Sequence, residues 1–181
     1  MILFDLPIYQ FIMSIFSVNN TILTIMKLIT TLGSTLVIVS GILSVAIISW
    51  KNKKIFLTFL SANLIGVILN NLIKIIVRRP RPTQTLVMTV ENSYSFPSGH
   101  SMMSMIFYGL IIYYIMKYMK NKRLKNILVP LLSAIIFLIG ISRIYLGVHY
   151  ATDVLCGWII GLAYLIIFIK ILNRKKIKQS K

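Results

Sequence analysis

Long apolar runs dominate this sequence and limit the folds that are open to it. After residue 30 there are five runs, each close to the roughly 20 residues that a helix needs to cross a bilayer core. They cover residues 32–50, 55–77, 100–117, 126–143 and 150–170. Hydrophobic residues make up 57% of the chain and the mean hydropathy is +0.86, above the roughly half apolar content of soluble domains. We therefore predict an all-α, polytopic transmembrane helix bundle with about five spanning helices.

The N-terminal segment, residues 1–30, is also apolar but is interrupted by Pro7 and by two adjacent asparagines. From Thr21 onward, polar residues recur every third position, a pattern typical of helices that lie in the membrane interface. A full span within residues 2–18 is left open. A cleaved signal peptide is not expected, because the segment lacks a basic start and Asp5 breaks it.

The chain is strongly basic, with 20 Lys and Arg against three acidic residues and a formal net charge of +17. Such a balance can indicate nucleic-acid binding. Here the basic residues lie in short segments between the apolar runs, where they can bind anionic headgroups. Membrane lipids, not nucleic acids, are the expected partners. Cys156, the single cysteine, lies in an apolar run and is expected to be a packing residue.

The basic segments also predict an orientation. They follow the first run (51–54), separate the third from the fourth (117–125) and end the chain (170–181). Alternating spans place all three on one side, which the positive-inside rule makes cytoplasmic. We expect a multi-pass cell-membrane protein with a cytoplasmic C-terminus. Its expected parts are an N-terminal interfacial segment (1–30), a transmembrane domain (31–172) and a basic cytoplasmic tail (173–181).

The opposite, outer side contains residues 78–99 and the turn near 144–149. Arginines at 78, 79 and 81 lie there against the orientation rule, which indicates anion binding or contact with headgroups. Lys74 lies near the outer end of its run, and alone it would be read as a lysine that reaches the headgroups. Pro80 and Pro82 end the helix and present Arg81, whose planar group of donors matches phosphate oxygens.

Two further clusters come to this side. Ser98, Gly99 and His100 lie where the third run begins; alone they could be a simple helix cap, but a helix start also offers free amides to an anion. His149 and Asp153 are four residues apart and share a helix face, so the carboxylate can orient the imidazole as in catalytic triads. A pair at this spacing is more often structural.

A metal site is the competing interpretation of the two histidines and the aspartate. Lys74, Arg81 and Arg143 would lie beside it and repel a cation. We therefore expect a bound anion, with no metal and no cofactor.

Together the clusters read Lys, six residues, Arg-Pro; Pro-Ser-Gly-His; and Ser-Arg, five residues, His, three residues, Asp. This pattern resembles the complete signature of the type 2 phosphatidic acid phosphatase family, which vanadium haloperoxidases share. The resemblance covers about residues 30–172, and within the family it points to small bacterial lipid phosphatases of the phosphatidylglycerophosphatase B kind. Many members have six spans, which leaves the N-terminal arrangement open.

The resemblance implies a role for each signature residue. His149 attacks phosphorus and forms a phosphohistidine, Asp153 orients it, and His100 protonates the leaving group and then helps to activate water. The implied phosphate-binding residues are Lys74, Arg81, Ser98, Gly99 and Arg143. The implied substrate is a lipid phosphate from the outer leaflet, such as undecaprenyl diphosphate, phosphatidylglycerol phosphate or phosphatidic acid.

Three other functions remain as alternatives. A non-catalytic lipid-phosphate binding or carrier protein would not need a nucleophile and an acid. A vanadate-binding oxidoreductase would resemble soluble relatives, against which the apolar runs argue. A transferase would pass the phosphoryl group to an alcohol instead of water. The oligomeric state is not predicted.

Overall fold

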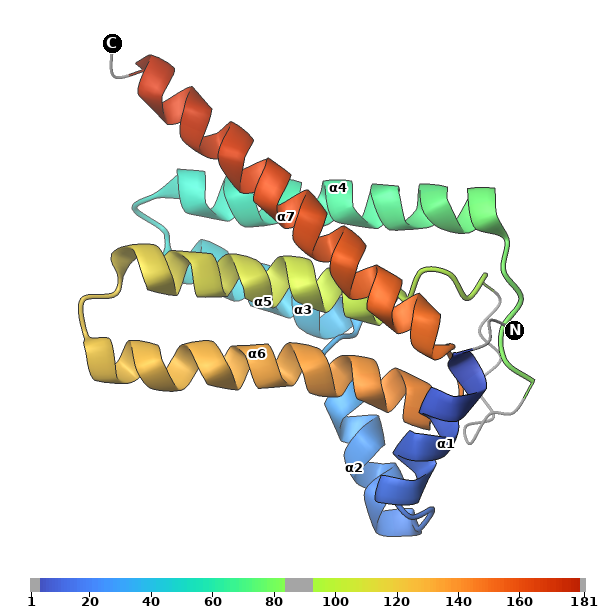
Figure 1. Ribbon diagram of the computed structural model, residues 1–181. Coiled ribbons are helices and arrows are strands. Elements are labelled where there is room, and N and C mark those ends of the chain that lie inside the picture. The colour runs from blue at the N-terminus through green and yellow to red at the C-terminus, as the bar shows by residue number, and fades with distance from the viewer. Residues whose placement is uncertain (1–3, 84–92, 180–181) are drawn as a thin grey trace.

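The computed structural model describes residues 4–83 and 93–179, and in these residues the fold is entirely helical (Figure 1). The helices are α1 (Asp5–Ile15), α2 (Asn20–Thr31), α3 (Thr35–Ile48), α4 (Lys53–Val77), α5 (Gly99–Tyr118), α6 (Lys122–Tyr145) and α7 (Ala151–Gln179). The predicted all-α bundle is confirmed.

Four of the five expected spans form helices that are long and apolar enough to cross a membrane, namely α4, α5, α6 and α7. The expected span at 32–50 is longer than the helix found there. Helix α3 has 14 residues and rises about 21 Å, less than the ~30 Å of a bilayer core. It starts late because residues 32–34 form a turn and the Ser34 side chain caps the helix by accepting from the Val37 amide.

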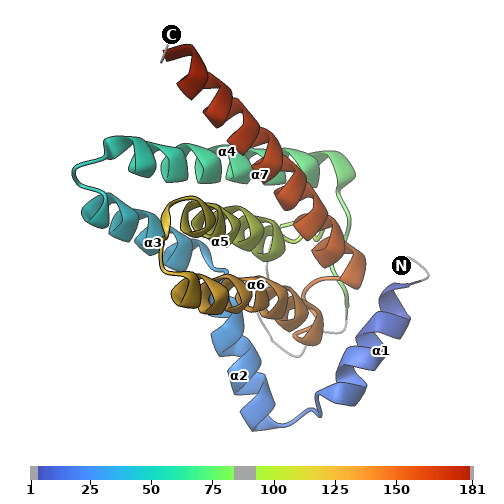
Figure 2. The same ribbon diagram turned by 60° about the vertical axis from the view of Figure 1, so that its left-hand side comes forward.

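The N-terminal segment forms two short helices. Helix α1 has 11 residues and α2 has 12, so each rises only about 16–18 Å. A bend of 120° separates them, and Asn19 caps α2 by accepting from the Ile22 amide. They form a V beside the bundle (Figure 2), and their position in the membrane interface stays a prediction.

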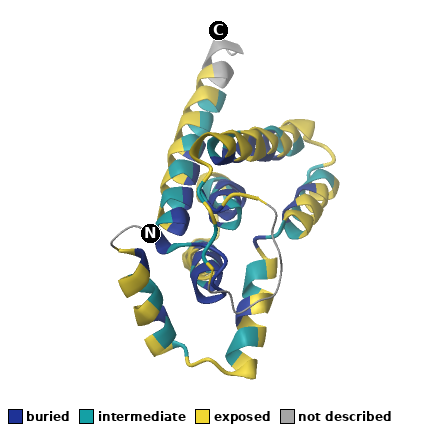
Figure 3. Cartoon of the chain, turned by 90° about the vertical axis from the view of Figure 1, so that its right-hand side faces the viewer, coloured by how far each residue is buried: buried dark blue, intermediate teal, exposed yellow. Residues whose placement is uncertain are grey.

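Helix α5 is the centre of the bundle and packs against α4, α6 and α7. Met102, Ile106 and Leu110 of this helix are fully buried. Figure 3 shows buried residues on the faces that point inward and exposed residues on the outer faces. Many exposed side chains are large and apolar, such as Leu36 and Ile76, each about 80% exposed, as expected of a surface that faces lipid.

The helix ends gather the predicted clusters at one end of the bundle. The C-termini of α4 and α6 and the N-termini of α5 and α7 all lie there, at the right of Figure 1. Helix α4 ends with Arg78 in the left-handed conformation (φ 50°), and the α6–α7 turn contains Gly147 at φ 70°. The basic connections of α3–α4 and α5–α6 lie at the opposite end. Residues 84–92 of the expected outer segment lie outside the described residues.

Candidate active site

The segment after α4 and the segment before α5 lie side by side, and their contacts fix the side chains of Lys74 and Arg81. The Ser95 amide donates to the Arg79 carbonyl oxygen (2.9 Å), which brings the chain before α5 alongside the chain after α4. Arg81 donates from Nε to the Ser93 carbonyl (2.8 Å) and from an Nη to the Ser93 hydroxyl (2.9 Å). The Lys74 ammonium donates to the Tyr94 carbonyl. Both cations are therefore fixed by backbone groups of residues 93–94.

Helix α5 begins at this point. Ser98 is its N-cap, and its hydroxyl accepts from the Ser101 amide (3.4 Å) and from the Ser101 hydroxyl (2.9 Å). The Ser98 amide donates to the Asp153 carbonyl (3.0 Å), which joins the start of α5 to α7. A Cβ added to Gly33 would lie 3.2 Å from Cδ2 of His100. The α2–α3 turn therefore packs against the His100 ring.

His149 lies in the α6–α7 turn and is 3% exposed. Its Nδ1 is 3.4 Å from Oδ2 of Asp153, and its Nε2 is 3.4 Å from an Nη of Arg81. The first distance is within ion-pair range but longer than a well-formed hydrogen bond. A guanidinium only donates hydrogen bonds, so the proton of a neutral ring belongs on Nδ1. Nε2 then carries its lone pair toward Arg81.

The surroundings of His149 favour the neutral ring. Burial lowers its pKa to about 4, from an ordinary value of 6.5, and the positive charges of Arg143 and Arg81 act in the same direction. The Asp153 carboxylate opposes this effect by hydrogen bonding and by charge. At neutral pH the imidazole is therefore uncharged and able to act as a nucleophile.

A cavity of about 430 Å³ joins five of the predicted residues: Lys74, Arg81, Gly99, His100 and His149. Its polar end contains the cations and the two imidazoles. Its other end runs between α3 and α4 and is lined by apolar side chains, including Ile42 and Leu64. Leu64 is 58% exposed, so the cavity opens sideways at the outer surface of the bundle. This shape suits a molecule with an anionic head and an apolar tail.

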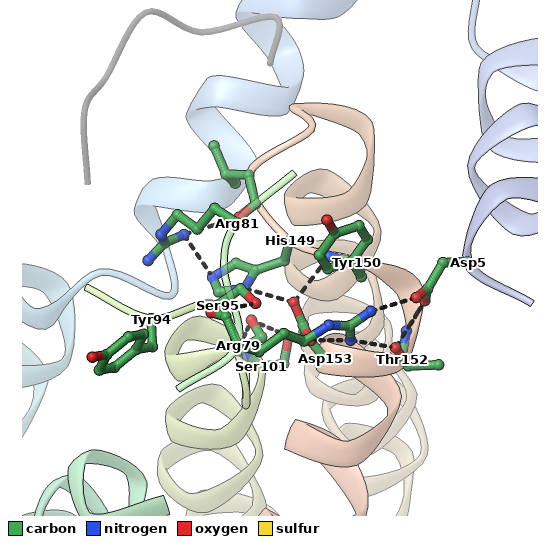
Figure 4. A network of polar contacts seen from close by, with 12 residues as sticks. Asp5, Arg79, Arg81, Tyr94, Ser95, Ser101, His149, Tyr150, Thr152 and Asp153 are labelled. Atoms are coloured by element: carbon green, nitrogen blue, oxygen red, sulfur yellow. Dashed lines mark hydrogen bonds and ion pairs between the residues drawn. The ribbon is translucent and has the colours of Figure 1, made fainter. Parts of the chain in front are cut away.

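Behind His149, Arg79 connects two buried carboxylates (Figure 4). It donates to Oδ1 of Asp153 (2.6 Å) and to Oδ2 of Asp5 (2.6 Å). It also donates to the Thr152 hydroxyl (2.7 Å) and lies 3.9 Å from the centre of the Tyr150 ring. Arg79, whose role the sequence left open between anion binding and contact with headgroups, is therefore held by carboxylates of the protein itself. Arg78, in contrast, is exposed and donates to the Ile75 carbonyl of its own helix.

A family model described as the PAP2 superfamily matches residues 55–177, more than half of the chain. The chain belongs to this superfamily. That range contains every predicted site residue, from Lys74 to Asp153, and lacks α1, α2 and α3.

Individual PAP2 relatives agree with this assignment. Phosphatidylglycerophosphatase B of Bacillus subtilis is 40% identical over 99 residues, which are 52% of this chain and 47% of the relative. Dolichyldiphosphatase 1 of Rhinolophus ferrumequinum is 32% identical over 137 residues, 71% of this chain and 56% of the relative. The chain thus spans about half the length of the curated relatives that it matches.

A solved PAP2 structure supports the fold. The crystal structure of a transmembrane PAP2-type phosphatidylglycerolphosphate phosphatase from Bacillus subtilis matches with a TM-score of 0.83 and 29% identity, over 94% of this chain and 85% of the other. Aquifex aeolicus LpxE has the same fold, with a TM-score of 0.71 and 24% identity, over 93% and 96% of the two chains. Long apolar helices and these relatives together make the chain a multi-pass membrane protein.

The PAP2 signature residues do not all reach the cavity. Asp153 lies behind His149, and Arg143 donates to the Thr30 hydroxyl (3.1 Å) while lowering the pKa of His149. Ser98 is fully buried at the helix start and is not among the lining residues. A Cβ on Gly99 would lie 3.4 Å from Oδ1 of Asn70, an ordinary contact, so packing within the protein does not require glycine there.

Sequence reasoning missed the part that Asp5, Arg79 and Thr152 take in this site. One signal was present, because an acidic residue in an apolar segment needs a partner and the chain has only three acids. In residues 4–83 and 93–179 no three His, Cys, Asp or Glu side chains are grouped as metal ligands. The metal-free mechanism remains a prediction.

Proposed function

We propose that this protein is an integral membrane lipid phosphatase that hydrolyses phosphate or diphosphate esters of lipids through a phosphohistidine at His149. The observation that carries the proposal is the cavity itself. One end brings a buried neutral imidazole together with two fixed cations, and the other end is apolar and opens between α3 and α4.

The cations and the helix start are suited to bind the phosphate. Lys74 and Arg81 line the cavity and are held by backbone carbonyls. Gly99 adds the first turn of α5, where amides point outward and the helix dipole favours an anion. Ser98 and Arg143 act indirectly in our proposal. Ser98 caps the start of α5, and Arg143 lowers the pKa of His149. Fixed donors stabilise the extra charge of the phosphoryl group as it is transferred.

The chemistry has two balanced steps. Nε2 of His149 attacks phosphorus, a P–N bond forms, the P–O bond to the lipid breaks, and His100 gives its proton to the leaving oxygen. Water then attacks phosphorus, His100 takes the proton, the P–N bond breaks and phosphate leaves. Asp153 faces Nδ1 and stabilises the positive charge of the ring while it is phosphorylated. No metal enters either step.

The substrate class follows from the relatives and the groove. The curated relatives are named for phosphatidylglycerophosphate, undecaprenyl diphosphate and dolichyl diphosphate, all phosphates on long apolar tails. In our proposal the tail lies between α3 and α4 and the phosphate reaches Lys74 and Arg81 at the outer end of the bundle. The lipid then comes from the outer leaflet and the C-terminus lies in the cytoplasm.

The test is phosphate release by the purified protein from a panel of lipid mono- and diphosphates, with a chelator present throughout. We expect release from at least one lipid phosphate, with activity unaffected by the chelator. No release from any member of the panel would refute the proposal. Activity that is lost with the chelator and restored by a divalent metal would refute its metal-free form.

His149→Ala is the matched control for the covalent step. The variant should release no phosphate, because no other group supplies the nucleophile, while it still binds a lipid phosphate in the cavity. A phosphorylated protein should be trapped by acid quenching of the wild type and be absent from His149→Ala. Normal turnover in His149→Ala would exclude the phosphohistidine.

A further inference from the structure

A buried chain of charges continues from His149 to the N-terminal helix. Asp153 is fully buried and Asp5 is 2% exposed, and the Arg79 side chain between them is 14% exposed. Both ion pairs measure 2.6 Å. Asp5 also accepts, through Oδ1, from the Thr152 amide (2.9 Å) and hydroxyl (2.8 Å). Helix α1 is thus joined to the start of α7.

This network fixes the rotation of the Asp153 carboxylate. Oδ1 accepts from Arg79, while Oδ2 accepts from the Tyr150 amide (3.0 Å) and faces Nδ1 of His149. Arg79 is itself held by Asp5 on its other Nη and by the Tyr150 ring. Each group in the series therefore has its orientation set by the one before it. Support of this kind is what holds a reactive imidazole in one tautomer and position.

The charges in the network also matter for His149. Arg79 alone would cancel the negative charge of Asp153. Asp5 supplies a second negative charge, so that the group of three has a net charge of −1 that Asp153 presents to the imidazole. Charges buried inside a protein are weakly screened. Removing the charge of Asp5 or of Arg79 therefore changes the electrostatic field at His149.

We propose that Asp5 is a positioning residue for the reaction at His149, acting through Arg79 and Asp153. The proposal rests on the function proposed above, in which His149 is the nucleophile. It makes the N-terminal helix, which lies outside the residues matched by the PAP2 family model, a part of the active site. Helix α1 must be docked for the site to be complete.

Other charged and titratable groups around His149 come from each neighbouring element. They are Lys74 of α4, Arg81 of the segment after it, His100 of α5, Arg143 of α6 and Asp153 of α7. None of these is changed in the Asp5 and Arg79 variants below, so a change in the behaviour of His149 in those variants reports the Asp5–Arg79 part of the network.

The test combines kinetics with a direct view of the ring. The chain has two histidines, so ¹⁵N-histidine labelling gives two ring signals, and a His100→Asn variant assigns them. Asp5→Asn should lower kcat about tenfold and change KM less than twofold. It should also lower the pH at which the His149 ring titrates, because the positive charge of Arg79 is then less balanced. Arg79→Gln should raise that pH.

Two controls separate positioning from general damage. Arg78→Gln removes a neighbouring charge that makes no contact with the site and should change neither kcat nor the ring titration. Asp5→Asn in an Arg79→Gln background should cause no further loss of kcat, since Asp5 acts through Arg79. Asp5→Glu should restore part of kcat.

The possible failures are distinguishable. If wild type releases phosphate and His149→Ala does not, but the Asp5 and Arg79 variants match wild type in kcat and ring titration, the inference is wrong and the proposed function stands. If wild type releases no phosphate, the proposed function is wrong and the positioning role falls with it, while the ring titrations still show whether Asp5 and Arg79 set the charge at His149. If Asp5→Asn does not fold, Arg79→Gln is compared with Asp5→Glu, which keeps the negative charge. If the His149 ring titrates at the same pH in both variants, the inference is wrong.

Discussion

The His149 imidazole combines burial with contact to opposite charges, and the balance decides its protonation. Removal from water and the nearby arginines disfavour the imidazolium, while Asp153 favours it, and the result is a pKa of about 4. A surface histidine would be about half protonated at pH 6.5. His149 stays neutral throughout the range in which the phosphate of a substrate changes its own ionisation, near pH 6. Its lone pair is therefore available whenever the phosphate carries its second negative charge.

The same shift predicts how stability depends on pH. In the unfolded chain a histidine takes up a proton below about pH 6.5, whereas the folded protein excludes that proton from His149 down to about pH 4. Folding is therefore disfavoured as the pH falls through this window, by about 1.4 kcal/mol per unit. Thermal unfolding in detergent should show a steeper fall in Tm for wild type than for His149→Ala between these values. Equal slopes would mean that the ring is not buried in its neutral form.

Sequence patterns placed the cavity residues well but not the residues that support them. Lys74, Arg81, His100 and His149 come together because spans that alternate in direction bring their helix ends to one side. Asp5 and Asp153 are 148 positions apart, and their connection through Arg79 depends on how α1 folds back onto the site. Neither periodicity nor charge spacing contains that information, so the sequence left the role of Arg79 open between anion binding and contact with headgroups.

Among the elements, α3 and α4 decide what can enter the cavity. Their facing side chains form its apolar end, and the short α3 leaves α4 partly uncovered, so that side chains such as Leu64 are exposed. The sequence contained a signal for the short helix, since Gly33 and Ser34 form a turn and a cap inside an apolar run. A reading by hydropathy alone includes Gly33 and Ser34 in the predicted span 32–50, because neither residue is strongly polar. The ends of the other spans were placed within four residues, because charged or turn-forming residues mark them, except that α7 continues past the predicted end at 170 to Gln179.

Filling the groove should weaken binding of the lipid tail without harming the chemistry. Leu64→Trp places a larger ring between α3 and α4 and should raise KM for a long-chain lipid phosphate about tenfold, the equivalent of about 1.4 kcal/mol. KM for a short-chain, water-soluble phosphate ester should stay within twofold. Leu72→Trp is the matched control, since Leu72 is similarly exposed on α4 (52%) but is not among the residues that line the cavity. Equal effects of both variants would place the tail elsewhere.

At the scale of the whole molecule, charge is divided between the two ends of the bundle. The end away from the site contains the lysines of the α3–α4 and α5–α6 connections, which suit a cytoplasmic face. The site end also contains arginines, and two of them have specific partners in the site. Arg79 pairs with two carboxylates, and Arg81 lies beside His149. Two of the three exceptions to the orientation rule are therefore explained by the site, and the rule still predicts that the site faces outward.

Cysteine labelling tests this orientation. In a Cys156→Ala background, Thr83→Cys should react in intact cells with a thiol reagent that cannot cross the membrane, because Thr83 is exposed at the site end. Lys120→Cys, exposed in the α5–α6 connection, should react only after permeabilisation. The two positions lie at opposite ends of the bundle, so each is a control for the accessibility of the other. The reverse pattern would place the phosphate-binding end in the cytoplasm, and a lipid phosphate would then have to enter the groove from the inner leaflet.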